Sequence, residues 1–297
     1  MHPPGHAGAG VIPGITIGGI GFRIHLLFWL VMLGSVVTGH FLEVITLFGI
    51  VLIHELGHVS MARGLNWTVR EVVMLPFGGV ARMEVRRESV REEIMVILAG
   101  PLMNMLMLPF AWLFGWLGWW NLLWVDYFVS ANLFIAGFNL LPVPPLDGGR
   151  LLLAVSYRFA SYLRALRQAA IAGVLGAVAL FLFSLAWGRG TGGIHLNLLL
   201  IACFLGVHNV RDWREIPYRF VLFLLRRRQH PESAVRYRPL LLSFTMDMRL
   251  RHLLEQMRWE RYHLFVRFPE FLLGEEELLR FFFDENASQR KMRELLR

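Results

Sequence analysis

Long apolar segments fill most of the chain up to about residue 212, and they constrain its fold more than any other feature. A membrane-spanning helix needs about 20 mostly apolar residues, because the hydrocarbon core of a bilayer is about 30 Å thick. Overall, 56% of the 297 residues are apolar. We predict an α-helical integral membrane protein with six transmembrane helices, at roughly residues 22–40, 41–63, 92–117, 121–141, 168–187 and 194–212.

The arginines between these segments predict their orientation. Many follow the second and fourth segments, whereas the connections after the first and third contain no Arg or Lys. Loops rich in Arg and Lys remain in the cytoplasm. We therefore expect both termini to be cytoplasmic, and the second and fourth helices to end at the cytoplasmic leaflet. The formal net charge of +8 fits cytoplasmic loops beside lipid headgroups, so we predict no nucleic-acid partner.

Composition divides the chain into four parts. The first 21 residues are rich in Gly and Pro, and we expect a flexible segment there. An Arg-rich stretch follows the last apolar segment, and the sequence after it is less apolar and reads as a small soluble domain. The predicted domains are residues 1–21 (flexible), 22–212 (six-helix membrane domain), 213–230 (basic linker) and 231–297 (small α/β domain).

His54, Glu55 and His58 lie near the end of the second apolar segment, in 53-IHELGH-58. Ionisable side chains are costly inside a bilayer, so three within five residues indicate a functional site. Residues four apart share one helix face, so both imidazoles can reach one metal ion. In His-Glu-x-x-His, the histidines bind Zn²⁺ and the glutamate is the general base. We predict these roles, against the alternative that the histidines only bond to neighbouring residues.

A third zinc ligand is predicted at Asp147, in 144-PPLDGGR-150 after the fourth apolar segment. Catalytic zinc sites use three protein ligands and keep one position open. The prolines interrupt the helix, and non-helical backbone at membrane depth is tolerated only where it is buried or lines a wet cavity. The alternative is a simple helix-ending Asp-Gly turn. The predicted orientation brings Asp147 to the same leaflet as the two histidines. We therefore expect all three residues to bind the same ion, one Zn²⁺ per chain.

A β-hairpin is predicted after the second helix, in 67-WTVREVVMLPFGGVARMEV-85. The valines favour strand, and Pro76-Phe77-Gly78-Gly79 favours a turn. An edge of this hairpin can pair with an extended peptide by β-addition. We therefore predict substrate contacts at Phe77, Gly78 and Gly79, and the alternative is a purely structural hairpin.

The motifs 53-IHELGH-58 and 139-NLLPVPPLDGG-149 resemble those of the site-2 protease family of intramembrane zinc metalloproteases, and 99-AGP-101 is similar to the start of its middle core helix. The resemblance implies that His54, His58 and Asp147 bind zinc and that Glu55 activates water. It also implies that Asn139 and Pro142 shape the site or the substrate path. The family often has Asn-Pro-Asp-Gly in the last motif, whereas Leu146 precedes the aspartate here.

The stretches 50-IVLIHELGHVSMA-62 and 139-NLLPVPPLDGGRLL-152 are most similar to the sporulation branch of that family. This resemblance implies a substrate, a membrane-associated precursor of a sporulation sigma factor that loses its N-terminal pro-segment near the cytoplasmic face. It further implies inhibitory membrane-protein partners and a location in the mother-cell membrane around the forespore.

The C-terminal region shows helical periodicity at 249–260, strand-like alternation at 262–268 and a helix start at 274–284. We read the region as strand, helix, strand, helix, an order that resembles one cystathionine-β-synthase-type (CBS) repeat, a domain that the sporulation branch carries. The resemblance implies ATP or another adenine nucleotide as a ligand, and pairing of chains into a homo-oligomer. The alternative is a small docking or dimerisation module.

Two other functions fit parts of these observations. A protease of the same family could act on other membrane substrates, such as signal-peptide remnants or an anti-sigma factor. A metal transporter could use the same ligands as a transit site, but transporters usually contain internal repeats with interrupted helices, and the sequence shows no such halves. A transporter also has no use for Glu55 as a base.

Overall fold

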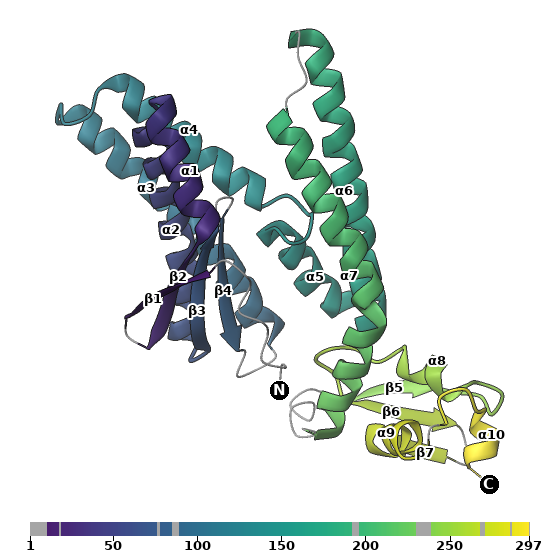
Figure 1. The fold of residues 1–297 in the computed structure, drawn as a ribbon. Coiled ribbons are helices and arrows are strands. Elements are labelled where there is room, and N and C mark those ends of the chain that lie inside the picture. Colours follow the sequence, from purple (N-terminus) through teal and green to yellow (C-terminus); the bar gives the residue numbers. More distant parts are fainter. Residues whose placement is uncertain are drawn as a thin grey trace. The chain divides into compact units, whose positions relative to one another are not determined.

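A computed structural model describes residues 11–17, 19–75, 78–84, 89–191, 196–229, 239–267, 271–285 and 287–296 (Figure 1). The chain forms two compact units, which we describe separately. The first comprises Met1–Arg87 and Arg91–Leu140, and the second comprises Glu88–Val90 and Leu141–Arg297.

The helices of the first unit are α1 (Leu26–Thr38), α2 (Phe41–Gly64), α3 (Val90–Trp116) and α4 (Leu122–Asn139). Short turns connect α1 to α2 and α3 to α4, and a glycine in the left-handed region enables each of these two turns, at Gly39 (φ 80°) and Gly118 (φ 72°). Asn121 then caps α4, because its side chain accepts a hydrogen bond from the Trp124 backbone N–H at 2.7 Å.

Helices α2, α3 and α4 form the core of this unit. Ile50, Met107 and Ala131, one residue from each helix, belong to a single buried cluster. The opposite side of α3 is apolar but exposed, at Leu102, Leu106 and Phe110, which follow one another at a spacing of four residues. A helix that is apolar all round is expected where its outer face meets lipid.

A four-stranded sheet completes the first unit, with strands β1 (Val11–Ile17), β2 (Ile20–His25), β3 (Thr68–Leu75) and β4 (Gly78–Glu84) in the order β1-β2-β3-β4. The predicted hairpin is confirmed as the antiparallel pair β3 and β4. Strand β2 pairs in parallel with β3, so the hairpin belongs to a larger sheet than the sequence predicted.

The N-terminal residues differ from the prediction. Part of the segment expected to be flexible forms β1 and the start of β2, and residues 1–10 lie outside the described residues. The first predicted span therefore begins as a strand and continues in α1, which has only 13 residues. Hydropathy alone does not distinguish a strand followed by a short helix from one long helix.

The second unit begins with three helices, α5 (Asp147–Phe159), α6 (Tyr162–Thr191) and α7 (Leu196–Gln229). Figure 1 shows α6 and α7 running side by side. The sequence did not predict α5, and residues 213–229, predicted as a linker, are the second half of α7. Arginine is a good helix former, so an Arg-rich composition did not exclude a helix there.

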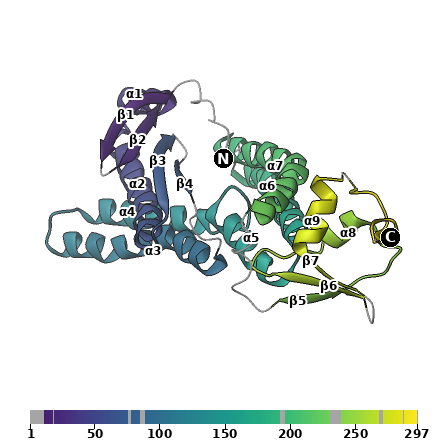
Figure 2. The same ribbon diagram turned by 90° about the horizontal axis from the view of Figure 1, so that it is seen from below.

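The C-terminal region contains β5 (Leu240–Ser243), α8 (Leu250–Leu254), β6 (His263–Arg267), β7 (Phe271–Gly274), α9 (Glu275–Phe283) and α10 (Met292–Leu295). Its sheet has the order β5-β6-β7, and α8 and α9 lie on one face of it (Figure 2). The predicted α/β character is present. The CBS-type assignment and nucleotide binding stay predictions.

In the described part of the chain, four helices are long and apolar enough to cross a membrane: Phe41–Gly64, Val90–Trp116, Leu122–Asn139 and Tyr162–Ala186. The prediction of six spans is therefore not confirmed. Two of the six predicted spans are missing from these four helices. The first predicted span contains the short α1, and the sixth is the first half of α7. That helix continues into a charged segment with Arg211, Asp212 and Arg214.

Candidate metal centre

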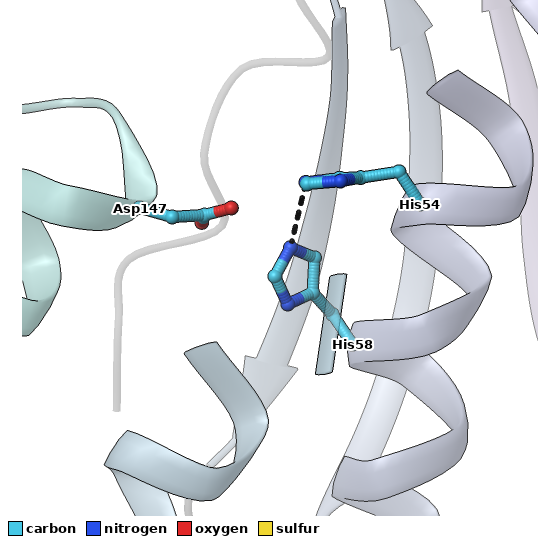
Figure 3. A group of neighbouring side chains, drawn as sticks. All are labelled: His54, His58 and Asp147. Carbon is cyan, nitrogen blue, oxygen red and sulfur yellow. Dashed lines mark hydrogen bonds between the residues drawn. The ribbon is translucent and has the colours of Figure 1, made fainter. Parts of the chain in front are cut away.

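His54 and His58 lie one turn apart on α2, with only 2% and 3% of their surfaces exposed. Their Nε2 atoms are 3.2 Å apart (Figure 3). Two nitrogens that each lie about 2.0–2.1 Å from one tetrahedral zinc ion are about 3.3 Å apart. The separation of the two imidazoles therefore matches a shared metal ion.

The other ring nitrogens identify the tautomers. His58 Nδ1 lies 2.7 Å from the Val96 carbonyl oxygen, which can only accept a hydrogen bond, so Nδ1 carries the hydrogen. His54 Nδ1 lies 2.5 Å from Asn104 Oδ1, which is also an acceptor. In neutral imidazoles, both Nε2 atoms are then unprotonated and present lone pairs to one another. An unprotonated ring nitrogen is the atom with which histidine binds a metal ion, so the donor set suits a metal ion.

Asn104 extends this support across α3 and α4. Its Nδ2 donates to Asn132 Oδ1 at 3.1 Å, and Asn132 Nδ2 donates to the Phe128 carbonyl at 2.9 Å. Both asparagines are completely buried. Hydrogen bonds to the second nitrogen of a ligand histidine set its orientation and tautomer. Neither asparagine was predicted as a site residue from the sequence, although a polar side chain in an apolar span is a signal of such a role.

Two glycines let α3 approach the histidines closely. A Cβ atom on Gly100 would overlap His58 Nε2 and would lie 2.8 Å from His54 Nε2. A Cβ atom on Gly57 would lie 2.6 Å from the Ala99 carbonyl oxygen. Gly57 therefore allows close packing of α2 against α3, and Gly100 keeps open the space beside the imidazole nitrogens.

Asp147 is the first residue of α5 and is buried, with 8% of its surface exposed. One ligand atom from each of His54, His58 and Asp147 lies within 4.8 Å of the others, and Figure 3 shows the carboxylate directed toward the imidazoles. Two imidazoles and a carboxylate are a usual zinc ligand set. Together these three residues fit a metal ion.

The remaining predicted site residues occupy various places. Glu55 is half-buried on α2, beside His54. Asn139 is the last residue of α4 and half-buried, and Pro142 is exposed in the turn that follows. Gly78 and Gly79 begin β4, opposite Leu75 and Met74 of β3. Phe77 lies outside the described residues.

Comparisons with known proteins agree with this site. The model of peptidase family M50 matches residues 42–118 and 114–183. Stage IV sporulation protein FB of Bacillus subtilis is 28% identical over 284 residues, which cover 92% of this chain and 95% of that protein. A zinc metalloprotease of Methanocaldococcus jannaschii is 32% identical over 200 residues, which cover 65% of this chain and 52% of that protein.

A solved structure is also similar. The site-2 protease from Methanocaldococcus jannaschii matches with a TM-score of 0.53 and 27% sequence identity, covering 68% of this chain and 94% of that one. The M50 match spans α2, α3, α4 and Asp147, the parts that carry the candidate metal centre. The chain therefore belongs to peptidase family M50, the site-2 protease family of intramembrane metalloproteases.

Proposed function

We propose that this protein is an intramembrane zinc endopeptidase that cleaves a membrane-associated precursor near the cytoplasmic face. The observation that carries the proposal is the geometry of the histidine pair. Two buried Nε2 lone pairs face one point at 3.2 Å separation, and each ring is oriented by a hydrogen bond at Nδ1. A shared metal ion explains this arrangement, because the separation of the two Nε2 atoms is that of two ligands of one tetrahedral zinc ion.

In this proposal His54, His58 and Asp147 hold the ion, and Asn104 and the Val96 carbonyl keep both imidazoles in the binding tautomer. A zinc ion held there would supply a water of lowered pKa and a polarised scissile carbonyl. Glu55 would accept a proton from the attacking water and pass it to the leaving amine. The burial of both histidines excludes bulk water, which strengthens the electrostatic interactions within the site.

The substrate segment must be extended, because a helical peptide hides its carbonyl groups in internal hydrogen bonds. We propose that it pairs with β4 at Gly78 and Gly79, in the manner of β-addition. Strand β4 is supported as the receiving strand by its position at one end of the order β1-β2-β3-β4, which leaves one side of it without a neighbouring strand in the described sheet. Asn139 and Pro142 are proposed to shape the path of the substrate.

We propose the precursor of a sporulation sigma factor as the substrate, and inhibitory membrane proteins as regulatory partners. The proposal is supported by similarity to stage IV sporulation protein FB, which extends over 92% of this chain. Another membrane substrate, such as a signal-peptide remnant or an anti-sigma factor, is the second candidate.

Co-expression of the full chain with a candidate precursor tests the proposed reaction. Glu55→Gln keeps the shape of the side chain and removes its basicity, so cleavage should fall at least about 100-fold, the lower range for loss of a general base. Gel analysis measures the processed product. Undiminished cleavage by the variant would remove Glu55 from the mechanism.

The zinc content of purified variants distinguishes the proposed general base, Glu55, from the proposed zinc ligands. Purified Glu55→Gln should retain about one zinc per chain, whereas Asp147→Asn should retain much less, because a neutral amide is a weaker ligand than a carboxylate. Elemental analysis measures the metal. Equal zinc in Asp147→Asn and wild type would exclude Asp147 as a ligand, and a zinc-free, active wild type would overturn the proposed function itself.

A further inference from the structure

Asn209 is a completely buried polar residue on α7 to which neither the family motifs nor the proposed mechanism gives a role. Its Nδ2 donates to the Pro144 carbonyl oxygen at 2.6 Å and to the Leu205 carbonyl oxygen at 2.8 Å. Because both partners are acceptors, the amide orientation is unambiguous. Asn209 therefore fixes the backbone of the segment between α4 and α5, 65 residues away in the sequence.

The other side of the amide faces α6. A Cβ atom on Gly173 would overlap the Asn209 amide, so α6 approaches α7 at this point only because residue 173 has no side chain. Asn209 Oδ1 is buried and has no hydrogen-bond partner in the part of the chain that the structure describes. A buried oxygen without a hydrogen bond destabilises the folded state, and an apolar residue would pack the two helices without this loss of stability. The contact that Asn209 adds beyond helix packing is the one to Pro144.

The same segment is held at a second point. The Val143 side chain is buried and occupies the position that a Cβ atom on Gly176, one turn after Gly173, would require. Leu146 N–H donates to the Val143 carbonyl at 3.0 Å, and the Leu146 carbonyl accepts from Gly149 N–H at 3.0 Å. Each of these contacts lies within a few residues of Asp147.

We propose that Asn209 is a positioning residue for Asp147. By holding the Pro144 carbonyl against α7, it sets the start of α5, where Asp147 is the first residue. The proposal rests on the proposed zinc function, because it assigns Asp147 as a ligand. It adds that helix α7, which supplies no ligand, contributes to zinc affinity through one amide.

Zinc affinity, rather than activity, tests the proposal. Asn209→Ala in the full-length chain should weaken zinc binding about 10- to 100-fold, the usual effect of losing an outer partner of a metal site. Competition with a chromophoric chelator measures the dissociation constant, at a temperature where circular dichroism shows the variant folded. Unchanged affinity in folded Asn209→Ala would overturn the proposal.

Two glycines on the same helix pair provide a matched comparison. Gly173→Ala introduces a Cβ that must displace the Asn209 amide, so it should weaken zinc binding similarly. Gly206→Ala places its Cβ 3.8 Å from Ala177, an ordinary contact, so it should not change zinc affinity. Equal losses in both glycine variants would indicate general damage to the helix pair and would also overturn the proposal.

The double variant tests whether the two residues act through one contact. Once Asn209 is Ala, the clash at residue 173 disappears, so adding Gly173→Ala should cause little further loss of zinc affinity. Fully additive losses would contradict the proposed contact. A wild-type chain that binds no zinc would instead overturn the proposed function, so the two failures are distinguishable.

Discussion

Gly100 and its surroundings explain why the histidine pair can face a metal ion. The residue lies on α3 against the Nε2 atoms of His54 and His58, and a Cβ atom at this position would crowd both of these nitrogens. Asn104, one turn later on the same helix, orients His54. One helix turn of α3 thus leaves space beside the two candidate ligands on α2 and orients one of them, His54.

Gly100→Ala should weaken zinc binding, because the added methyl group would crowd the Nε2 atoms of both His54 and His58. We expect at least about a 10-fold loss of affinity, as for other changes next to metal ligands. Zinc content after dialysis measures the loss. Gly49→Ala is the matched control on α2, since its Cβ would enter open space, and it should retain zinc and gain helix propensity. Zinc retention by Gly100→Ala would contradict the expected crowding of the two imidazoles.

At the scale of elements, the end of α7 is joined to the C-terminal sheet by a buried polar network. Arg227 on α7 donates to the Arg258 carbonyl at 2.8 Å, and its Nη1 lies 3.7 Å from Glu275 Oε2 at the start of α9. Glu275 Oε1 lies 2.6 Å from His263 Nδ1 on β6. The side chains of Arg227, Glu275 and His263 are at most 4% exposed. Breaking such a buried pair is more costly than breaking a surface pair.

His263 makes this network sensitive to acid. Burial lowers the pKa of His263 below its ordinary value of 6.5, an effect that Glu275 opposes and that Arg227 and Arg258 reinforce. In addition, His263 Nε2 accepts a hydrogen bond from the Arg258 backbone N–H at 3.0 Å, and protonation of Nε2 would prevent this bond. The folded state therefore binds this proton less readily than the unfolded state. The stabilisation is complete above pH 6.5 and is lost as the pH falls below that value toward the folded-state pKa.

Hydrogen exchange of β6 amides in the full chain, corrected for the intrinsic effect of pH, should show weaker protection at pH 5 than at pH 7. His263→Gln should reduce this difference, because glutamine does not titrate. His252→Gln, on the exposed face of α8, is the control and should behave as wild type. Equal protection at both pH values in wild type would contradict the expected role of His263.

For the whole molecule, the sequence and the fold together predict an orientation in the membrane. The four long apolar helices and the membership of family M50 identify an integral membrane protein. The arginines after the second and fourth predicted spans favour cytoplasmic termini. The turn between α3 and α4, where Trp119 is 71% exposed, should then face the opposite side.

Cysteine labelling tests this orientation. Cys203, the only cysteine, is exposed and is first replaced by Ser. In this background, Trp119→Cys should react with a membrane-impermeant maleimide in intact cells. Gln289→Cys, near the C-terminus, should react only after permeabilisation, because charged reagents do not cross the bilayer. The reverse pattern would overturn the predicted topology.

Features that depend on neighbours along the chain could be predicted from the amino-acid sequence. The i, i+4 spacing puts His54 and His58 on one helix face, and the valines and turn residues after α2 predict the β3–β4 hairpin. Both predictions depend on local backbone geometry, which is encoded within a few residues. The Asp147 prediction was different, because it combined a local turn motif with the predicted membrane depth.

Tertiary packing brings together the distant residues that support these groups. Asn104 meets His54 across 50 residues, and Asn209 meets Pro144 across 65. No local sequence pattern predicts either of these two contacts. Likewise, pairing with β1 and β3 made residues 20–25 a strand rather than the start of a span. A bilayer and a protein core both favour apolar side chains, so hydropathy predicts which segments avoid water. Three-dimensional packing decides whether such a segment forms a helix or a strand.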